Sequence, residues 1–335
     1  MAERAPIDIT VHIGHVKSAS TFLQKNLAAN AGDRAGYTYL GYNTFADLID
    51  LMVHHVSGGK AWGHSGRLPA KLQLDIPLNA NFDRPVFASN ESLCGIYSTV
   101  HRHVAQSSMT APVMRAFQKR ICEAVQAAFP TARILLVARA PAGWLVSVYR
   151  DMVRMGLSLS LDDFLARDID VLAQWYDLDY LRETYAAAFG ADHVITLPFE
   201  QLRSDRDAFT GVVEGILGRT LAWDHTPIHQ GFDDGTVEAL RRLNVMVDRM
   251  APPAESWEHP GLVLKQQVAA FLEQSVGGGV FIAPSADNAA YLAKEFAALK
   301  KPLVPSPAAV RALADRCRAT AALPAFAPYR AQYAQ

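Results

Sequence analysis

The sequence predicts an α/β fold in which helices cover both faces of a central parallel sheet, followed by a mostly helical C-terminal portion. Short apolar segments of strand type alternate with segments of helical periodicity over roughly the first 220 residues, and this alternation is typical of a parallel sheet buried on both faces. Apolar residues make up 50% and charged residues 19% of the 335 residues. That is ordinary globular composition, which excludes collagen-like, coiled-coil and disordered chains.

The strands and helices can be placed in order along the chain. Residues 7–13 alternate and are rich in β-branched side chains, 36–41 form a short extended segment, and apolar runs lie at 85–89, 133–138 and 193–197. Helical periodicity is found at 21–30, 114–129, 142–155, 162–189, 205–217 and 235–250. A last helix is predicted at 308–322, packing back on the body, because Ser306 and Pro307 suit its N-cap and first turn.

We interpret residues 1–335 as a single α/β domain, with a core at 7–220 and a mainly helical extension at 221–335. The formal net charge of −1 argues against a protein that coats nucleic acid. No segment approaches the roughly 18–20 apolar residues that a membrane helix needs, and no signal peptide is recognisable. The three isolated cysteines fit a reducing compartment. We therefore expect a cytoplasmic protein without a membrane span or a nucleic-acid partner.

The first predicted strand ends in a short loop with a lysine and three hydroxyl side chains. Residues 14–21 read GHVKSAST, with Lys17 in the middle and no acidic residue. The unpaired N–H groups and the dipole of a helix N-terminus attract anions, so we expect a phosphate or sulfate group here. The alternative is an ordinary turn with an exposed lysine and a Ser or Thr helix cap.

This loop differs from the Walker A loop of nucleoside triphosphatases, G-x-x-x-x-G-K-[ST]. Gly14 lies only three residues before Lys17, and Val16 rather than a glycine precedes the lysine. The loop is therefore too short to wrap a β/γ-phosphate pair in the manner of those enzymes.

A second motif follows the apolar strand at 133–138. Arg139 comes directly after the strand, Pro141 suits the first position of a helix, and Ser147 lies about two turns into that helix. The carboxyl end of a parallel strand is where open α/β sheets bind ligands, and a guanidinium suits a pair of phosphate oxygens. Arg139 and Ser147 could thus reach one phosphate. The alternative is a structural arginine paired with Asp151 or Asp163.

Together, the two motifs resemble those of sulfotransferases that use 3′-phosphoadenosine 5′-phosphosulfate (PAPS). The family loop P-K-[ST]-G-[ST]-T, which holds the 5′-phosphosulfate, corresponds to residues 16–21. The family signature R-x-P-x(5)-S-x-Y, which holds the 3′-phosphate, corresponds to residues 139–149. Weaker similarity at 189–202 and at 36–41, the latter to bacterial carbohydrate-type members, extends the resemblance over roughly residues 7–220. It implies a P-loop-type parallel sheet.

The chain departs from the family pattern at three places. Val16 replaces the family proline, and Ala19 replaces the family glycine. If that glycine position needs a positive φ, alanine there costs about 1 kcal/mol or more. The segment R-K-G-x-x-G-x-W of animal cytosolic members is absent, which implies that adenine and part of the 3′-phosphate are held differently.

The resemblance implies a mechanism and a set of site residues. PAPS would be the co-substrate and PAP (adenosine 3′,5′-bisphosphate) the product. Lys17 would stabilise charge on the leaving phosphate, and no metal would be needed. The other donor-binding residues implied by the resemblance are Ser18, Ala19, Ser20, Thr21, Arg139 and Ser147. The acceptor would be a hydroxyl or amine of a small molecule or carbohydrate.

The acceptor must lose a proton, which requires a general base. Glu91 is the first candidate because it follows the strand at 85–89 and the resemblance implies a glutamate from a comparable region. The alternative is a helix N-terminal charge or a salt-bridge partner. His15 is the second candidate, and the other rivals are His12, His101 and His103.

Other readings remain open at this point. There are two competing functions. One is a small-molecule kinase that uses ATP and magnesium, and the other is a non-catalytic descendant that binds a nucleotide or a partner. The histidines at 54, 55 and 64 lack zinc-ligand spacing, and Trp62, Trp144 and Trp175 suit either the core or an acceptor site. We expect the acceptor to contact residues 42–80 and the helical C-terminal third. The sequence has no recognisable signal for the identity of the acceptor or for the oligomeric state.

Overall fold

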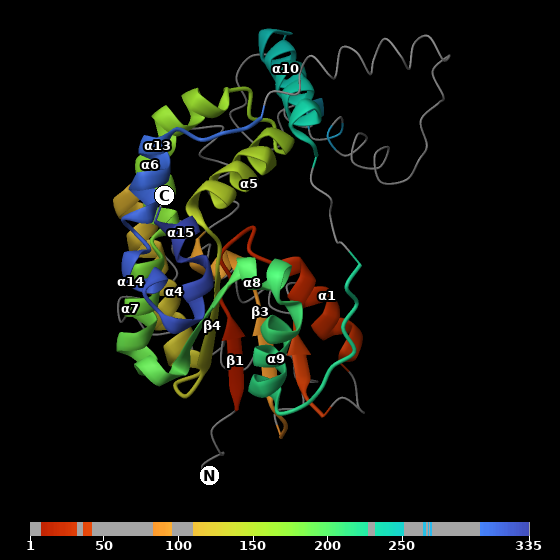
Figure 1. Ribbon diagram of the computed structural model, residues 1–335, viewed down its shortest axis with the longest axis vertical. Helices are drawn as coiled ribbons and strands as arrows, with labels where there is room; N and C mark the ends of the chain where they lie inside the picture. The colour runs from red at the N-terminus through yellow and green to blue at the C-terminus, as the bar shows by residue number, and fades with distance from the viewer. Residues whose placement is uncertain are drawn as a thin grey trace, which may run out of the picture.

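The structure is a computed structural model that describes residues 8–31, 36–41, 83–95, 110–226, 232–250, 264–265, 267, 269 and 302–334. Its centre is a five-stranded, all-parallel sheet with the strand order β2-β3-β1-β4-β5. The strands are β1 (Ile9–His12), β2 (Thr38–Leu40), β3 (Val86–Ser89), β4 (Arg133–Ala138) and β5 (Val194–Pro198). The α/β fold predicted from the sequence is confirmed, and Figure 1 shows helices on both sides of the sheet.

Strand β4 lies inside the sheet, and this position explains its continuous apolar run. Ile134 and Leu136 belong to one hydrophobic cluster, and Leu135 and Val137 belong to a second cluster on the opposite face. All four side chains are fully buried. A strand covered on both faces needs apolar residues at successive positions rather than at alternate ones.

One face of the sheet is covered by α1 (Ser20–Asn30) and α9 (Arg206–Leu217). Leu23 and Leu27 of α1 and Phe209 and Val213 of α9 are buried in the same cluster as Leu135. A short helix, α8 (Phe199–Ser204), connects β5 to α9. The position of α1 directs its N-terminus toward the carboxyl edge of the sheet, where β1 ends (Figure 1).

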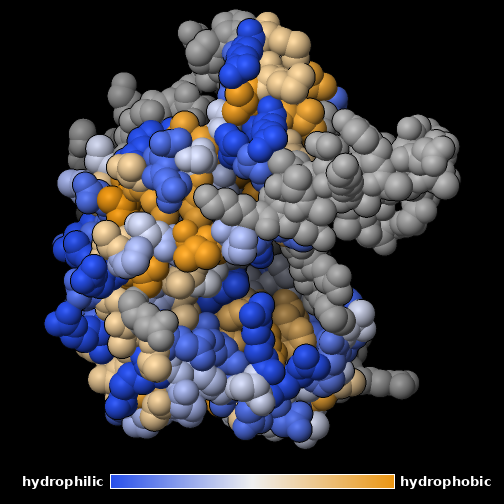
Figure 2. Space-filling view, turned by 45° about the horizontal axis from the view of Figure 1, so that its top comes forward, coloured by the Kyte–Doolittle hydropathy of each residue, from blue (hydrophilic) through white to orange (hydrophobic). Residues whose placement is uncertain are grey.

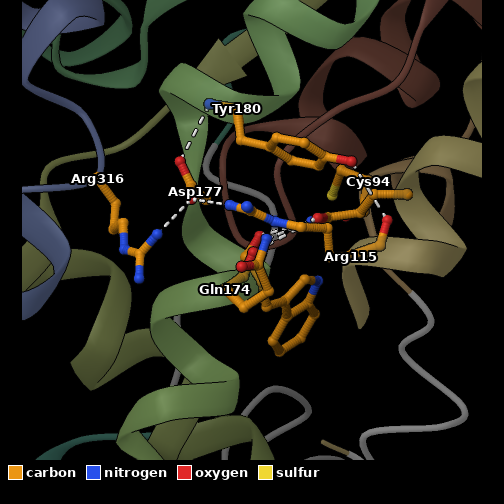
Figure 3. Close-up of polar contacts among 8 residues, drawn as sticks. Cys94, Arg115, Gln174, Asp177, Tyr180 and Arg316 are labelled. Atoms are coloured by element: carbon orange, nitrogen blue, oxygen red, sulfur yellow. Dashed lines mark hydrogen bonds and ion pairs between the residues drawn. The ribbon is translucent and has the colours of Figure 1, made fainter. Parts of the chain in front are cut away.

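The hydrophobic cluster on the other face contains side chains of α4 (Ala111–Ala128), α5 (Pro141–Arg154), α6 (Leu161–Tyr176) and α7 (Leu178–Phe189). The sequence predicts one helix over 162–189, and this prediction is wrong because the chain breaks at Asp177. The Asp177 carboxylate accepts a hydrogen bond from the Tyr180 N–H at 3.0 Å and so caps α7. It also pairs with Arg115 of α4 and with Arg316 near the C-terminus (Figure 3).

The C-terminal segment packs back on the body, as the sequence predicts. Ser306 accepts a hydrogen bond from the Ala309 N–H and Pro307 begins the helix, which confirms the predicted cap. The predicted helix at 308–322 is divided into two short helices. The elements after β5 and α9 are α10 (Asp234–Met250), α13 (Pro307–Ala314), α14 (Arg318–Ala321), the 3-10 helix η4 (Pro324–Tyr329) and α15 (Arg330–Tyr333). α13 packs against α5 and α6, and α15 packs against α5.

Within the described ranges, no helix is both long enough and apolar enough to cross a lipid bilayer.

Candidate functional site

Three chain segments with predicted site residues leave the sheet at the same edge. β1 leads into the loop with Lys17, β4 leads into Arg139, and β3 leads into the 3-10 helix η2 (Glu91–Cys94). These strands are neighbours in the order β3-β1-β4, and all run parallel, so their carboxyl ends meet. Figure 2, in which the top of Figure 1 comes forward, shows the surface hollowed in this region with hydrophilic side chains beside the hollow. Such an edge is the usual ligand position in open α/β sheets.

The loop after β1 has a strained backbone. Lys17 and Ala19 both adopt left-handed conformations, with φ of 63° and 66°. Each such residue without the freedom of glycine costs about 1–2 kcal/mol. The position that is glycine in the resembled family therefore does take a positive φ here, although the chain has alanine. Backbone strain of this kind persists where the surrounding structure fixes the loop. When residues with right-handed and left-handed conformations alternate, successive backbone N–H groups point to the same side of the loop, and such a group of N–H donors can bind an anion.

The N-terminus of α1 has unsatisfied hydrogen-bonding groups. Its N-cap residue is Ala19, no side chain in the described ranges caps it, and its first turn has no acidic residue. The hydroxyl oxygens of Ser18 and Ser20 are buried and have no partner among the residues that the structure describes. A buried hydroxyl without a hydrogen-bond partner is unfavourable unless a ligand supplies the missing hydrogen bond. Thr21, the next hydroxyl residue, is exposed. This arrangement suits a phosphate or sulfate oxygen.

Gly14 is needed where β1 turns into the loop. Its φ is 23°, and a Cβ added there would lie 2.7 Å from Nε2 of His12. The His12 ring is fully buried, and its Nδ1 lies 2.8 Å from the Ser89 hydroxyl on β3. Burial lowers the pKa of His12 to about 3. His12 therefore stays neutral at physiological pH, and its contacts indicate a structural link between β1 and β3 rather than a proton acceptor.

The second motif contacts the first directly. The Arg139 guanidinium donates a hydrogen bond from Nη1 to the carbonyl oxygen of Lys17 at 2.9 Å. Its face also lies over the Phe199 ring, 4.7 Å from the centroid. Burial lowers the pKa of Arg139 to about 10, with a further lowering by the charges of Arg203 and Arg150. Arg139 still remains cationic at neutral pH, in a region that gathers positive charge suited to an anionic ligand.

The backbone around Arg139 is held by three side chains that sequence reasoning missed. The Tyr176 hydroxyl donates to the Arg139 carbonyl at 2.7 Å, and the Ala140 N–H donates to Glu200 at 3.0 Å. The Tyr333 hydroxyl lies 3.1 Å from the Ala138 carbonyl oxygen and 2.6 Å from Glu200. The C-terminal helix α15 thus supports Arg139. Only Glu200 had a sequence signal, since it lies in the 189–202 segment.

One face of α5 looks toward both motifs. Gly143, Ser147 and Asp151 are spaced by four residues, which places them on the same side of the helix. A Cβ at Gly143 would lie 3.3 Å from Nε of Arg139, so the glycine leaves room for the guanidinium. Ser147 is half-buried on this face, between the glycine and the aspartate. The structure thus brings Ser147 to the same side as Arg139.

Asp151 pairs with the lysine of the loop rather than with Arg139. Lys17 Nζ donates to Asp151 Oδ1 at 2.7 Å, and the two side chains are 29% and 5% exposed. Arg154, one turn later, contacts the same oxygen at 3.2 Å. The alternative in which Arg139 pairs with Asp151 or Asp163 is not supported, because the Asp163 carboxylate contacts Ser160 instead. The spacing of Asp151 after Ser147 was the available signal for its place in the site.

Glu91 begins η2 at the same edge of the sheet. It lies two residues after Ser89, which pairs with His12 in the register of β1 and β3. The end of η2 is anchored by Gln118 of α4, whose amide donates to the Cys94 carbonyl at 3.0 Å. The same amide lies 3.3 Å from the Gln174 carbonyl oxygen, and Figure 3 shows Cys94 and Gln174 in this group of polar contacts.

His15 is placed in an aromatic cluster behind the loop. The side chain is fully buried, and its ring stacks on Trp144 with a centroid distance of 4.9 Å. Its Nε2 lies 3.3 Å from the Trp175 carbonyl oxygen, and burial lowers its pKa to about 3. A group that binds a proton so weakly is a poor base near neutral pH. These contacts favour a packing role for His15 over the predicted catalytic one.

Both described tryptophans of the predicted aromatic set are core residues. Trp144 and Trp175 are fully buried, and Trp144 donates from Nε1 to the Val16 carbonyl at 3.0 Å. Trp144 therefore fixes the loop at the position where the family has proline. His54, His55, Trp62, His64, His101 and His103 lie outside the described residues. Within the described ranges, no three His, Cys, Asp or Glu side chains gather as metal ligands would.

Comparisons with known proteins give a family for the chain. A search of curated proteins found no match. Among solved structures, a sulfotransferase from Alicyclobacillus acidocaldarius is similar, with 15% sequence identity, a TM-score of 0.43, and coverage of 74% of this chain and 96% of that chain. A model of the sulfotransferase family matches residues 10–224, well over half of the chain and including both motifs. The chain therefore belongs to the sulfotransferase family.

Proposed function

We propose that the protein transfers a sulfuryl group from PAPS to a hydroxyl or amine of a small-molecule or carbohydrate acceptor. The observation that supports this most directly is the hydrogen bond from Arg139 to the Lys17 carbonyl. It joins two cationic segments, more than 100 positions apart in the sequence, at one edge of the sheet. A donor with anionic groups at both its 5′ and 3′ positions needs such a pair of neighbouring sites.

The loop would bind the 5′-phosphosulfate. Two features of the described part of the chain fit that group: the Ser18 and Ser20 hydroxyls, which find no partner there, and the N-terminus of α1, which no side chain there caps at Ala19. Backbone N–H groups from Ala19 to Thr21 and the Lys17 ammonium would supply donors and charge, whereas the Ser18 N–H donates to the His15 carbonyl oxygen at 3.1 Å. The left-handed backbone at Ala19 supports this role, because it turns the loop without needing a glycine.

Arg139 and Ser147 would bind the 3′-phosphate. The Arg139 side chain is held between the loop and Phe199, and its backbone is fixed by Tyr176 and Glu200. A fixed guanidinium binds a phosphate with less loss of conformational entropy than a mobile one. The charges of Arg150 and Arg203 act on Arg139, so they add positive potential beside it, and Arg150 also pairs with Asp234.

PAPS supplies a sulfuryl group activated by a phosphate leaving group. In the transfer, a bond forms between sulfur and the acceptor oxygen or nitrogen, and the bond between sulfur and the bridging oxygen breaks. Lys17 would stabilise the charge that develops on the departing phosphate, and a base would take the acceptor proton. We assign the base role to Glu91, because η2 and the loop follow the neighbouring parallel strands β3 and β1, and we expect no metal to be required.

Glu91→Gln is expected to lower the rate of transfer by about 10²-fold or more, and to remove the acidic limb of the pH–rate profile, because the amide cannot accept the proton. His12 and His15, whose pKa values lie near 3, do not titrate between pH 5 and 8 and cannot produce a limb there. The measurement is the transfer rate as a function of pH for both proteins. An unchanged profile would remove Glu91 from the mechanism.

Calorimetry tests the proposed function against its competitors. We expect PAP to bind without magnesium, whereas a kinase would bind ATP with magnesium and a non-catalytic descendant without a donor site would bind neither. Radiolabelled PAPS, offered with a panel of hydroxyl and amine acceptors, then reports transfer directly. Failure of PAP to bind in the absence of metal would contradict the proposal.

A further inference from the structure

The carboxylate of Asp151 lies inside the cationic site, where the proposed function gives it no role. Its side chain is 5% exposed, and its Oδ1 accepts a hydrogen bond from Lys17 Nζ at 2.7 Å. A carboxylate at this place repels an incoming anion and occupies the ammonium that the anion needs. Its presence beside the loop lysine therefore calls for an explanation.

We propose that Asp151 is a positioning residue that holds the Lys17 ammonium against α5 in the unliganded protein and yields it to the anionic end of the donor. Asp151 and the 5′ group of the donor then compete for one cation. This inference rests on the proposed donor site, because it assigns Lys17 to the ligand in the bound state.

Arg154 makes this exchange energetically possible. It lies one turn after Asp151 on α5, and its Nη2 is 3.2 Å and its Nε 3.3 Å from Asp151 Oδ1. Removing the cationic partner of a buried carboxylate is strongly unfavourable when nothing replaces it. Arg154 keeps the carboxylate paired after Lys17 has turned away.

The Lys17 backbone stays fixed while the side chain can move. Its carbonyl accepts a hydrogen bond from Arg139 at 2.9 Å, and its side chain is 29% exposed. A lysine side chain has four methylene groups and a freely rotating ammonium. The ammonium can therefore change partners without rearrangement of the loop.

Substitution of Asp151 distinguishes this role from a structural one, because the two roles predict opposite changes in the affinity for PAP. Asp151→Asn removes the ion pair from the unliganded state, so we expect PAP to bind several-fold more tightly, up to about fivefold, which is the size of effect that a solvent-accessible ion pair has. If Asp151 only fastened the loop to α5, the same change would loosen the site and weaken binding. Isothermal calorimetry with PAP measures the difference, and asparagine preserves the side-chain shape.

Arg154→Gln provides a second variant with the opposite sign. Without Arg154, the carboxylate loses its alternative partner and retains Lys17 more strongly, so PAP is expected to bind several-fold more weakly. In an Asp151→Asn background the same change should have little effect, because no carboxylate remains to hold Lys17. An equal loss of affinity in both backgrounds would mean that Arg154 acts on the ligand directly, and would contradict the exchange.

A double-mutant cycle with Lys17→Ala tests whether Asp151 acts through the lysine. The tightening caused by Asp151→Asn should disappear in the Lys17→Ala background. If Asp151→Asn still tightens PAP binding in the Lys17→Ala background, Asp151 acts only by repelling the ligand, and the proposal is overturned. Asp224→Asn is the matched control, because Asp224 pairs with Lys25 of α1 at 2.8 Å on the exposed surface, and it should leave PAP binding unchanged.

The failure of this proposal is separable from failure of the donor site. If the wild-type protein binds no PAP, the proposed function fails. If the wild-type protein binds PAP and Asp151→Asn does not tighten it, the donor site stands and the competition between Asp151 and the ligand is excluded.

Discussion

Lys17→Ala is expected to reduce sulfuryl transfer by about 10³-fold or more, while PAP still binds within about tenfold of the wild-type affinity. The ammonium stabilises charge that develops at the bridging oxygen only as the bond to sulfur breaks. Removal of the ammonium therefore raises mainly the free energy of the transition state. In binding, its contribution is small because Lys17 must leave Asp151, with which it pairs at 2.7 Å. Turnover with radiolabelled PAPS and calorimetry with PAP measure the two effects.

Lys25→Ala is the matched control for this prediction. Lys25 belongs to the same helix, α1, and its exposed ammonium pairs with Asp224. Its removal changes the net charge by the same amount but should leave both turnover and PAP binding near the wild-type values. Near-normal turnover of Lys17→Ala would exclude Lys17 from the chemistry and leave it only a structural role.

Arg139→Ala is expected to weaken PAP by about 10²-fold, and adenosine 5′-phosphate only a few-fold, because only PAP has the 3′-phosphate. Hydrogen bonds to charged groups contribute about 1.5–3 kcal/mol each, and desolvation of Arg139 by burial strengthens its interaction with an anion. Calorimetry with the two nucleotides gives the ratio of affinities. A ratio is informative here because any general effect on folding acts on both ligands alike.

The hydrogen bond from Arg139 to the Lys17 carbonyl adds a condition to this test. If the main role of Arg139 is to support the loop, both nucleotides lose affinity equally, and the 3′-phosphate assignment is wrong. Arg133→Ala is the control, because Arg133 begins the same strand at its opposite end and pairs with Asp8. It should change neither affinity.

The parallel sheet could be predicted from the sequence because its strands have a local signature. The run RILLVA at 133–138 is apolar at successive positions, and the structure buries both its faces. The division of 162–189 could not be predicted in the same way. The helical periodicity continues across Asp177, whose carboxylate caps α7 and also pairs with Arg115 and Arg316, two residues distant from it in the sequence.

Some residues of the candidate site could likewise be predicted from the sequence, and others could not. Lys17 and Arg139 are recognisable because each follows a strand within a short motif. His15 belongs to the same loop, yet Trp144 and Tyr176 bury it in the core, and no local pattern distinguishes a buried histidine from a reactive one. The sequence suggests Asp151 only as an alternative partner of Arg139, and the structure pairs it with Lys17 instead.

The sequence by itself determined the alternation of strands and helices, and the cationic loop and arginine that follow two of the strands. These features depend on residues close together in the chain, whose propensities and spacing act locally. Only the tertiary structure decided the strand order, which makes β1 and β4 neighbours, and the pairing of Lys17 with a carboxylate of α5. Those contacts join residues more than 100 positions apart, and they form because the packing of both faces of one sheet leaves its carboxyl edge as the place where the loops meet.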